Sequence, residues 1–294
     1  MLLFRRMVVP AARPSVITVL NLKGGVGKTH ACWLLASVAQ ERQERILIVD
    51  TDTQGNITSS FLPGFEGNHG VEALFDPSAD PLVEPLIRRT AHSHIDIIPS
   101  SRALTRFDLA DQAAWEKSEL QASLIEPLNQ LRPLYDLIVF DCPPRLSLVS
   151  FAALCASDAV IVPLEAADWG AQGIKHVAQA AQYVQLHFNS RLRLLGYLVS
   201  RFKRPRSFQQ AYLRQLRTHF GTLAFDTVIP DLAAFEKAVT DRVPITLHDP
   251  RSNAAVIARD FYDEVQRRLQ DAPAVRTESR GPGLLRRAVA SVLG

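Results

Sequence analysis

Short apolar runs alternate along the chain with longer segments of helical period. These runs are rich in β-branched residues and begin at Val16, Ile46, Ile95, Asp136, Asp158 and Leu192. Near-continuous apolar strands are typical of a parallel sheet buried on both faces, and each gap between runs leaves room for a crossover helix. We therefore predict an α/β fold with a doubly wound, mostly parallel sheet and helices on both faces. A ligand should bind at the carboxyl ends of the strands.

The predicted sheet accounts for most of the chain. Of the 294 residues, 47% are hydrophobic and 21% are charged, which is the composition of a globular protein with a sizeable core. We predict an N-terminal extension (1–14), one domain that contains the whole sheet (15–270) and a linker with a short tail (271–294). The linker prediction rests on the Pro-, Gly- and charge-rich sequence DAPAVRTESRGPG.

Charge is distributed unevenly along the chain. Residues 1–185 contain 15 Lys and Arg against 20 Asp and Glu, whereas residues 186–294 contain 18 against 10. The basic C-terminal part is therefore a candidate for contact with a polyanion. No apolar run approaches the roughly 18 residues of a spanning helix, which argues against a membrane span. The three cysteines have no metal-ligand spacing, which favours reduced thiols and a cytoplasmic protein.

The strongest motif is the sequence KGGVGKT, which begins at Lys23 and lies between the first strand and a helical segment. Glycines allow a loop to turn its N–H groups around phosphate oxygens, and the following helix N-terminus favours negative charge. Lys28 would reach the β- and γ-phosphates, and the Thr29 hydroxyl would bind Mg²⁺. The usual first glycine is replaced by Leu22, and the extra lysine at position 23 makes this a deviant P-loop.

Two further strands end in carboxylates. Asp50 and Asp52 follow the second apolar run, and Asp141 ends the run that begins at Asp136. Asp141 occupies the position of a Walker B aspartate, which holds Mg²⁺ through water, and Asp52 could orient or deprotonate an attacking water. A lone Asp after a strand often caps a helix instead, but two such sites beside a P-loop favour the catalytic interpretation.

The chain resembles the ParA/Soj/MinD group of deviant-Walker ATPases, and its ParA branch in particular. The resemblance extends from about Val16 to Leu269. It rests on KGGVGKT, ILIVDTDTQGNIT, DLIVFDCPP, DAVIVPLEAADWGAQGI, RTHFGTLAFDTVIPD and HDPRSNAA.

The resemblance implies a role for each matching position. Lys23 would be the signature lysine that contacts ATP bound to the other subunit, so it implies an ATP-dependent sandwich homodimer. The catalytic residues would be Lys23, Lys28 and Asp52. The magnesium site would use Thr29, Asp50 and Asp141. The nucleotide would contact Gly24, Gly25, Val26, Gly27, Lys28, Thr29, His30, Pro230 and Asp231, of which Pro230 and Asp231 would lie near the adenine.

Two positions depart from the family pattern. His30 stands where the family usually has a second Thr or Ser, so only its backbone N–H is expected to contact the α-phosphate. Thr53 replaces a usual proline, which should loosen that turn without removing Asp52. Neither change affects the predicted catalytic lysines or carboxylates.

A basic segment follows the last predicted strand. The resemblance places it on the surface that family members use for sequence-independent DNA binding, through phosphate contacts that weaken as salt rises. The predicted DNA-binding residues are Arg201, Lys203, Arg204, Arg206, Arg214 and Arg217. A solvated basic face without a partner is the alternative.

These features favour a slow ATPase that acts as a switch in plasmid or chromosome segregation on the nucleoid, activated by a ParB-like centromere-binding protein. One alternative is a MinD-like or cargo-positioning ATPase that acts on a membrane or a protein cargo. Residues 284–293 form an amphipathic pattern that could bind a membrane surface, or could dock on the core or fray. Another alternative, a metabolic phosphotransferase, is disfavoured because Lys23 would have no role in it.

Overall fold

The computed structural model describes residues 15–67, 69–76, 83–108, 119–166, 171–203 and 206–271. These residues form a seven-stranded sheet with the order β3-β4-β2-β5-β1-β6-β7. The strands are β1 (Ser15–Val19), β2 (Ile46–Asp50), β3 (Arg88–Arg89), β4 (Ile95–Ile98), β5 (Leu137–Asp141), β6 (Ala159–Glu165) and β7 (Arg193–Ser200). All neighbouring pairs are parallel except β3 with β4.

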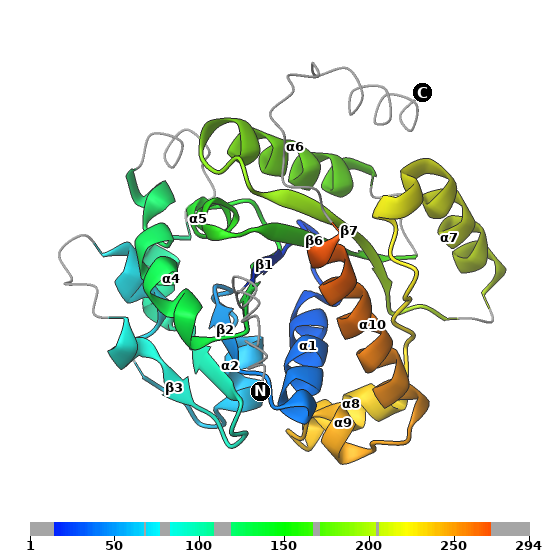
Figure 1. The fold of residues 1–294 in the computed structure, drawn as a ribbon, viewed down its shortest axis with the longest axis horizontal. Coiled ribbons are helices and arrows are strands. Elements are labelled where there is room, and N and C mark those ends of the chain that lie inside the picture. The colour runs from blue at the N-terminus through cyan, green and yellow to red at the C-terminus, as the bar shows by residue number, and fades with distance from the viewer. Residues whose placement is uncertain are drawn as a thin grey trace, which may run out of the picture.

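Helices cover both faces of this sheet (Figure 1). One face packs mainly against α4 (Ile125–Leu131), α5 (Leu148–Ala156), α6 (Ala171–His187) and α7 (Ser207–Phe220). The other packs against α1 (Lys28–Arg42), α2 (Asn56–Phe61), α8 (Ala233–Thr240), α9 (Ile245–His248) and α10 (Asn253–Gln270). The two layers explain why the central strands are mostly apolar, since every residue of β2 and β5 is buried, including the aspartate that ends each of them.

The strand order brings the carboxyl ends of β2, β5 and β1 next to one another. β1 pairs with β5 on one side and with β6 on the other, and β5 also pairs with β2. In this register Asp141 lies opposite both Val19 and Asp50. The end of β1, which leads into the glycine-rich loop, is therefore level with the two strand-end carboxylates.

The predicted fold class is confirmed, and all six predicted strands are present. The antiparallel edge strand β3 was not predicted, because two arginines carry no apolar signal. The division into segments 1–14, 15–270 and 271–294 stays a prediction, as does the membrane role of residues 284–293, which lie outside the described residues. Among the described helices, none combines the length and the hydropathy that crossing a bilayer requires.

Candidate nucleotide-binding site

The loop between β1 and α1 is fixed at its first residues and turns at its glycines. The side-chain amide of Asn21 donates to the Pro163 carbonyl of β6 at 2.6 Å, and its oxygen accepts from the Lys23 N–H at 3.0 Å. Gly25 and Gly27 have φ angles of 75° and 87°. Side chains strongly disfavour this left-handed region, so the sequence needs glycine at both turns.

The end of β7 packs against the same loop. A Cβ atom at Gly27 would lie 2.8 Å from the Ser200 Oγ. That hydroxyl donates a hydrogen bond to the Val26 carbonyl. The loop is thus held between β6 at its start and β7 at its last turn, and α1 begins directly after it.

Lys28 is the first residue of α1, and its side chain is buried. Its Nζ donates to the Lys23 carbonyl at 3.0 Å. Burial lowers the pKa of this ammonium, while the negative charges of Asp141 and Asp52 oppose the shift. A buried cation at a helix N-terminus is an arrangement that a bound anion stabilises.

Asp50 is fully buried, and its carboxylate is already engaged within the protein. Oδ2 accepts from the Thr58 N–H at 3.0 Å and from the Thr58 hydroxyl at 2.5 Å, and Oδ1 accepts from the Asp52 N–H at 3.1 Å. Burial raises the pKa of Asp50 to about 7 despite these bonds. Asp50 therefore holds α2 and the backbone of Asp52 in place, and its predicted role at a metal stays a prediction.

Asp141 lies beside Asp50 with different surroundings. It is 1% exposed, and within the described structure neither carboxylate oxygen accepts a hydrogen bond of normal geometry. Burial and the neighbouring Asp50 raise its pKa well above the ordinary value, while Thr29 and Lys28 favour the ionised form. Two buried oxygens without a donor are suited to a cation or its water ligands, so the residues present fit Mg²⁺.

The magnesium fit does not depend on a ligand cluster. In the described ranges, no group of three or more His, Cys, Asp or Glu side chains could hold a metal ion by itself. Mg²⁺ in nucleotide sites is usually held by one or two protein ligands together with phosphates and water. Thr29 and Asp141 are therefore the residues that would supply protein oxygens there.

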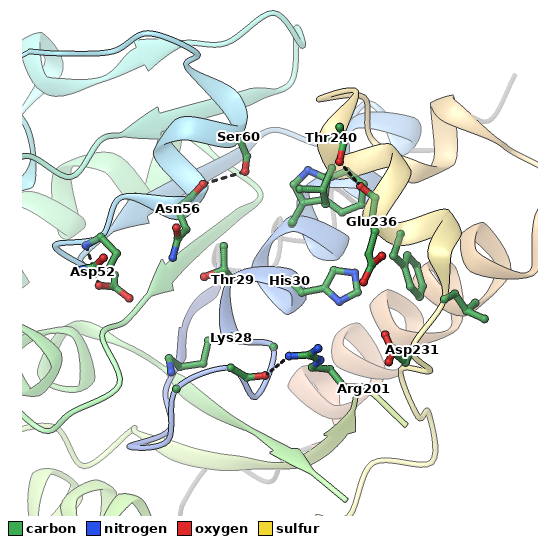
Figure 2. Close-up of a pocket in the computed structure, with 18 of the residues that line it drawn as sticks. Lys28, Thr29, His30, Asp52, Asn56, Ser60, Arg201, Asp231, Glu236 and Thr240 are labelled. Carbon is green, nitrogen blue, oxygen red and sulfur yellow. Dashed lines mark hydrogen bonds between the residues drawn. The ribbon is translucent and has the colours of Figure 1, made fainter. Parts of the chain in front are cut away.

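A cavity of about 620 Å³ opens over the glycine-rich loop (Figure 2). Lys28, Thr29 and Asp52 line one end of it. Asp52 is 7% exposed, and its Oδ1 accepts from the Gln54 N–H at 3.0 Å, which fixes the carboxylate toward the cavity. The structure thus brings together the P-loop and the carboxylate that the sequence predicted to act on water.

The other end of the cavity is more apolar. Its walls include Trp33, Pro230, Leu232, Phe235 and Val239, together with Asp231 and Glu236. The side chain of His30 lies between the two ends, with its ring 4.7 Å from that of Phe235. Burial, and then the positive charge of Arg201, lowers the pKa of His30 to about 4, so its ring is neutral at pH 7. A flat apolar end of this kind can accept a nucleobase.

The structure separates the predicted DNA-binding residues. Arg206, Arg214 and Arg217 are exposed, and Arg217 donates to the Asp226 carbonyl at 2.9 Å. Arg204 lies outside the described residues.

Two of the set lie nearer the nucleotide cavity. Lys203 is exposed and pairs with Asp231 at 3.0 Å. Arg201 lines the cavity itself, and its guanidinium donates to the Gly25 carbonyl at 3.3 Å.

Three residues of the site were not predicted from the sequence. Asn21 and Ser200 hold the loop, and Trp33 forms part of the apolar wall. Ser200 and Arg201 do carry a signal, because they follow a parallel strand at the edge where the carboxylates lie. Asn21 and Trp33 carry none that distinguishes them from ordinary loop and core residues.

Comparisons with known proteins agree with this geometry. The AAA domain family matches residues 14–194. The chromosome-partitioning ATPase Soj of Thermus thermophilus is 34% identical over 256 residues, which cover 87% of this chain and 97% of Soj. The chain belongs to the ParA/Soj family of P-loop ATPases.

Two further similarities extend over the same region. The sporulation initiation inhibitor protein Soj of Bacillus subtilis is 30% identical to this ParA/Soj-family ATPase over 85% of the chain and 97% of Soj. The structure of cobyrinic acid a,c-diamide synthase from Mycobacterium smegmatis with bound ADP and magnesium has a TM-score of 0.72 at 24% identity. It covers 88% of this chain and 96% of the synthase. At that identity the likeness concerns the fold.

Proposed function

We propose that this ATPase is a partition switch. ATP would bind with Mg²⁺ and favour a sandwich dimer on nonspecific DNA, in the cytoplasm and on the nucleoid. A ParB-like partner would stimulate hydrolysis and so release the complex, which would segregate a plasmid or chromosome. The chromosome-partitioning role in the printed name of the Thermus relative supports this proposal.

The observation that carries the proposal is the contrast between the two lysines of the P-loop. Lys28 is buried and lines the cavity, whereas the side chain of Lys23 is 42% exposed and is absent from the described residues that line it. Lys23 Nζ lies 3.7 Å from Glu165 at the end of β6. A lysine on the outer side of the loop can reach a nucleotide held by a second copy of the chain. Lys23 would then give up its partly exposed ion pair with Glu165, which contributes little to stability.

The protein's own residues suggest the order of events. Lys28 would exchange the Lys23 carbonyl for phosphate oxygens, which are stronger acceptors because they are charged. The N-terminal N–H groups of α1 would bind the same phosphates. Asp52 would orient the attacking water and accept its proton. Thr29 and Asp141 would hold Mg²⁺, which would supply positive charge to the phosphates.

Sedimentation velocity with Mg²⁺ and a nonhydrolysable ATP analogue tests the dimer. The wild-type chain should sediment as a dimer, and Lys23→Ala should sediment as a monomer that still binds the analogue. Lys203→Ala, which removes an exposed lysine from another loop, is the matched control and should dimerise. A saturated wild-type chain that remained monomeric would overturn the proposed switch.

A further inference from the structure

Arg201 is the first residue after β7. Its backbone is strained, and its side chain contacts the P-loop. Its φ of 52° lies in the left-handed region, which a long side chain occupies at a cost of about 1 kcal/mol. Its Nη1 donates to the Gly25 carbonyl at 3.3 Å. A Cβ atom at Gly25 would lie 3.8 Å from this nitrogen, so the guanidinium lies against the loop.

The surroundings of Arg201 belong to the cavity. His30 and Asp231 both line that cavity, and the charge of Arg201 acts on the buried His30 ring. Figure 2 shows Lys28 and Arg201 on opposite flanks of the P-loop, with Lys28 toward Asp52 and Arg201 toward Asp231. The side chain therefore lies at the end where the apolar wall would hold a base.

The cations of the cavity lie on opposite flanks of the P-loop, where one anionic ligand can contact both, while Asp52, Asp231 and Glu236 add negative charge to the lining. Among the described residues that line the cavity, Lys28 and Arg201 are those with permanently cationic side chains. Lys28 would be used at the outer phosphates, which leaves the phosphate next to the base without a side-chain cation. The Nε2 atom of His30 is buried and has no hydrogen-bond partner among the described residues, and at neutral pH that ring supplies no charge.

We propose that Arg201 is a nucleotide-binding residue whose guanidinium contacts the phosphate nearest the base, on the opposite flank of the P-loop from Lys28. This inference rests on the proposed nucleotide site and removes Arg201 from the predicted DNA surface. A planar guanidinium can donate two parallel hydrogen bonds to one phosphate, which makes it suited to this position.

Isothermal titration with ADP, without DNA, tests the assignment. Arg201→Gln should weaken ADP binding about 10- to 100-fold, the usual effect of losing a charged hydrogen bond. Arg201→Lys should recover only part of that loss, because it keeps the charge but cannot donate two parallel hydrogen bonds to one phosphate. Arg206→Gln is the matched control from the same basic segment and should bind ADP like the wild type. Arg206 is exposed, and its guanidinium lies 6.0 Å from the centre of the Phe208 ring.

Each outcome decides one question. If Arg201→Gln binds ADP like the wild type, the assignment is wrong while the nucleotide site remains. If Arg201→Lys binds as weakly as Arg201→Gln, the positive charge contributes nothing and the phosphate contact is wrong. If the wild-type chain does not bind ADP, the proposed function is wrong as well.

A second measurement is the affinity for DNA at saturating nucleotide. Arg201→Gln should bind DNA like the wild type, and Arg206→Gln should bind it more weakly. The opposite result would return Arg201 to the DNA surface.

Discussion

Asp50 and Asp141 are neighbours in register on adjacent strands, yet their carboxylates have different surroundings. Three donors surround the oxygens of Asp50, while those of Asp141 accept no hydrogen bond of normal geometry from the described residues. A buried carboxylate without donors is destabilising, and it persists only where another requirement maintains it. Asp141 is therefore the better candidate for the metal, and Asp50 for holding the loop that presents Asp52.

Replacing Asp141 with Asn should separate stability from ligand binding. We expect the free energy of unfolding of the nucleotide-free protein to rise by about 1–2 kcal/mol, because Asn removes the cost of ionising a buried carboxyl next to Asp50. The gain in ADP affinity that Mg²⁺ produces should fall. Urea unfolding and titrations with and without Mg²⁺ measure both effects. An unchanged magnesium dependence would exclude Asp141 from the metal site. Asp50→Asn is the control: it disrupts three hydrogen bonds and should be less stable than the wild type.

Asp52→Ala should bind nucleotide normally and fail to hydrolyse it. The carboxylate faces the cavity and is fixed by the Gln54 N–H, but it holds no part of the glycine-rich loop. We expect the rate of phosphate release to fall at least about 100-fold with little change in ATP affinity, since general-base catalysis contributes that much. Single-turnover hydrolysis with labelled ATP measures it. Hydrolysis at the wild-type rate would remove Asp52 from the mechanism.

At the scale of elements, β7 connects the nucleotide cavity to α10. The end of β7 supplies Ser200 and Arg201 to the P-loop, and residues 224–230 run beside it. This segment is fixed by Glu264 of α10, which accepts from the N–H groups of Asp226 and Thr227, each at 2.8 Å. Glu264 also pairs with Arg268 at 2.7 Å. A single buried carboxylate thus positions the loop that continues to Pro230 and Asp231.

Glu264→Gln should destabilise the fold in a pH-dependent way. Burial alone would raise the pKa of Glu264, but the hydrogen bonds from Thr227, Asp226 and Arg268 outweigh it and lower the pKa below the ordinary 4.5. The stabilisation is therefore complete above that value and is lost as the pH falls through the folded-state pKa. We expect a loss of about 2–4 kcal/mol near pH 7 and a smaller one near pH 4.

Urea unfolding at the two pH values measures this difference. Glu126→Gln, at an exposed position of α4, is the control and should change stability by less than about 0.5 kcal/mol. A difference between Glu264→Gln and the wild type that stayed constant across that pH range would show that the carboxylate charge contributes nothing.

The sequence predicted which candidate residues lie together at one edge of the sheet, because they follow strand ends, while their roles stay predictions. Lys28, Asp52 and Asp141 each lie after or at the end of an apolar strand, and parallel strands bring those ends together. Arg201 also lies after a strand, but its charge made it resemble the basic residues that follow it. Only its backbone conformation directs the side chain toward Gly25, and a φ of 52° at a non-glycine residue leaves no trace in the sequence.

On the scale of the whole molecule, the described basic residues that follow β7 have different surroundings. Arg201, Lys203, Arg206 and Arg214 are all exposed, but Arg201 lines the cavity and Lys203 is paired with Asp231. Binding to DNA phosphates needs solvent-facing cations, so the exposed arginines near and on α7, which lie outside the cavity lining, are the better candidates.

Replacing Arg206, Arg214 and Arg217 with Ala should weaken DNA binding without affecting ADP affinity. Each arginine that no longer neutralises a DNA phosphate should reduce the slope of log K against log salt by about 0.9, so we expect a shallower salt dependence as well as a lower affinity. Fluorescence anisotropy with duplex DNA across a salt series measures both. An unchanged slope would place the DNA surface elsewhere on the chain.

Both margins of the sheet are closed to further strands. On one side β3 consists of two arginines, Arg88 and Arg89. On the other, residues 224–230 occupy the hydrogen-bonding groups of β7, as in the bonds from the Phe225 and Ile229 N–H groups to the Tyr197 and Val199 carbonyls. A short, charged edge strand and a covered edge strand both prevent backbone pairing with a strand of another molecule. Permanent polymers through backbone pairing are thereby disfavoured, which leaves reversible association to the loops where ligands bind.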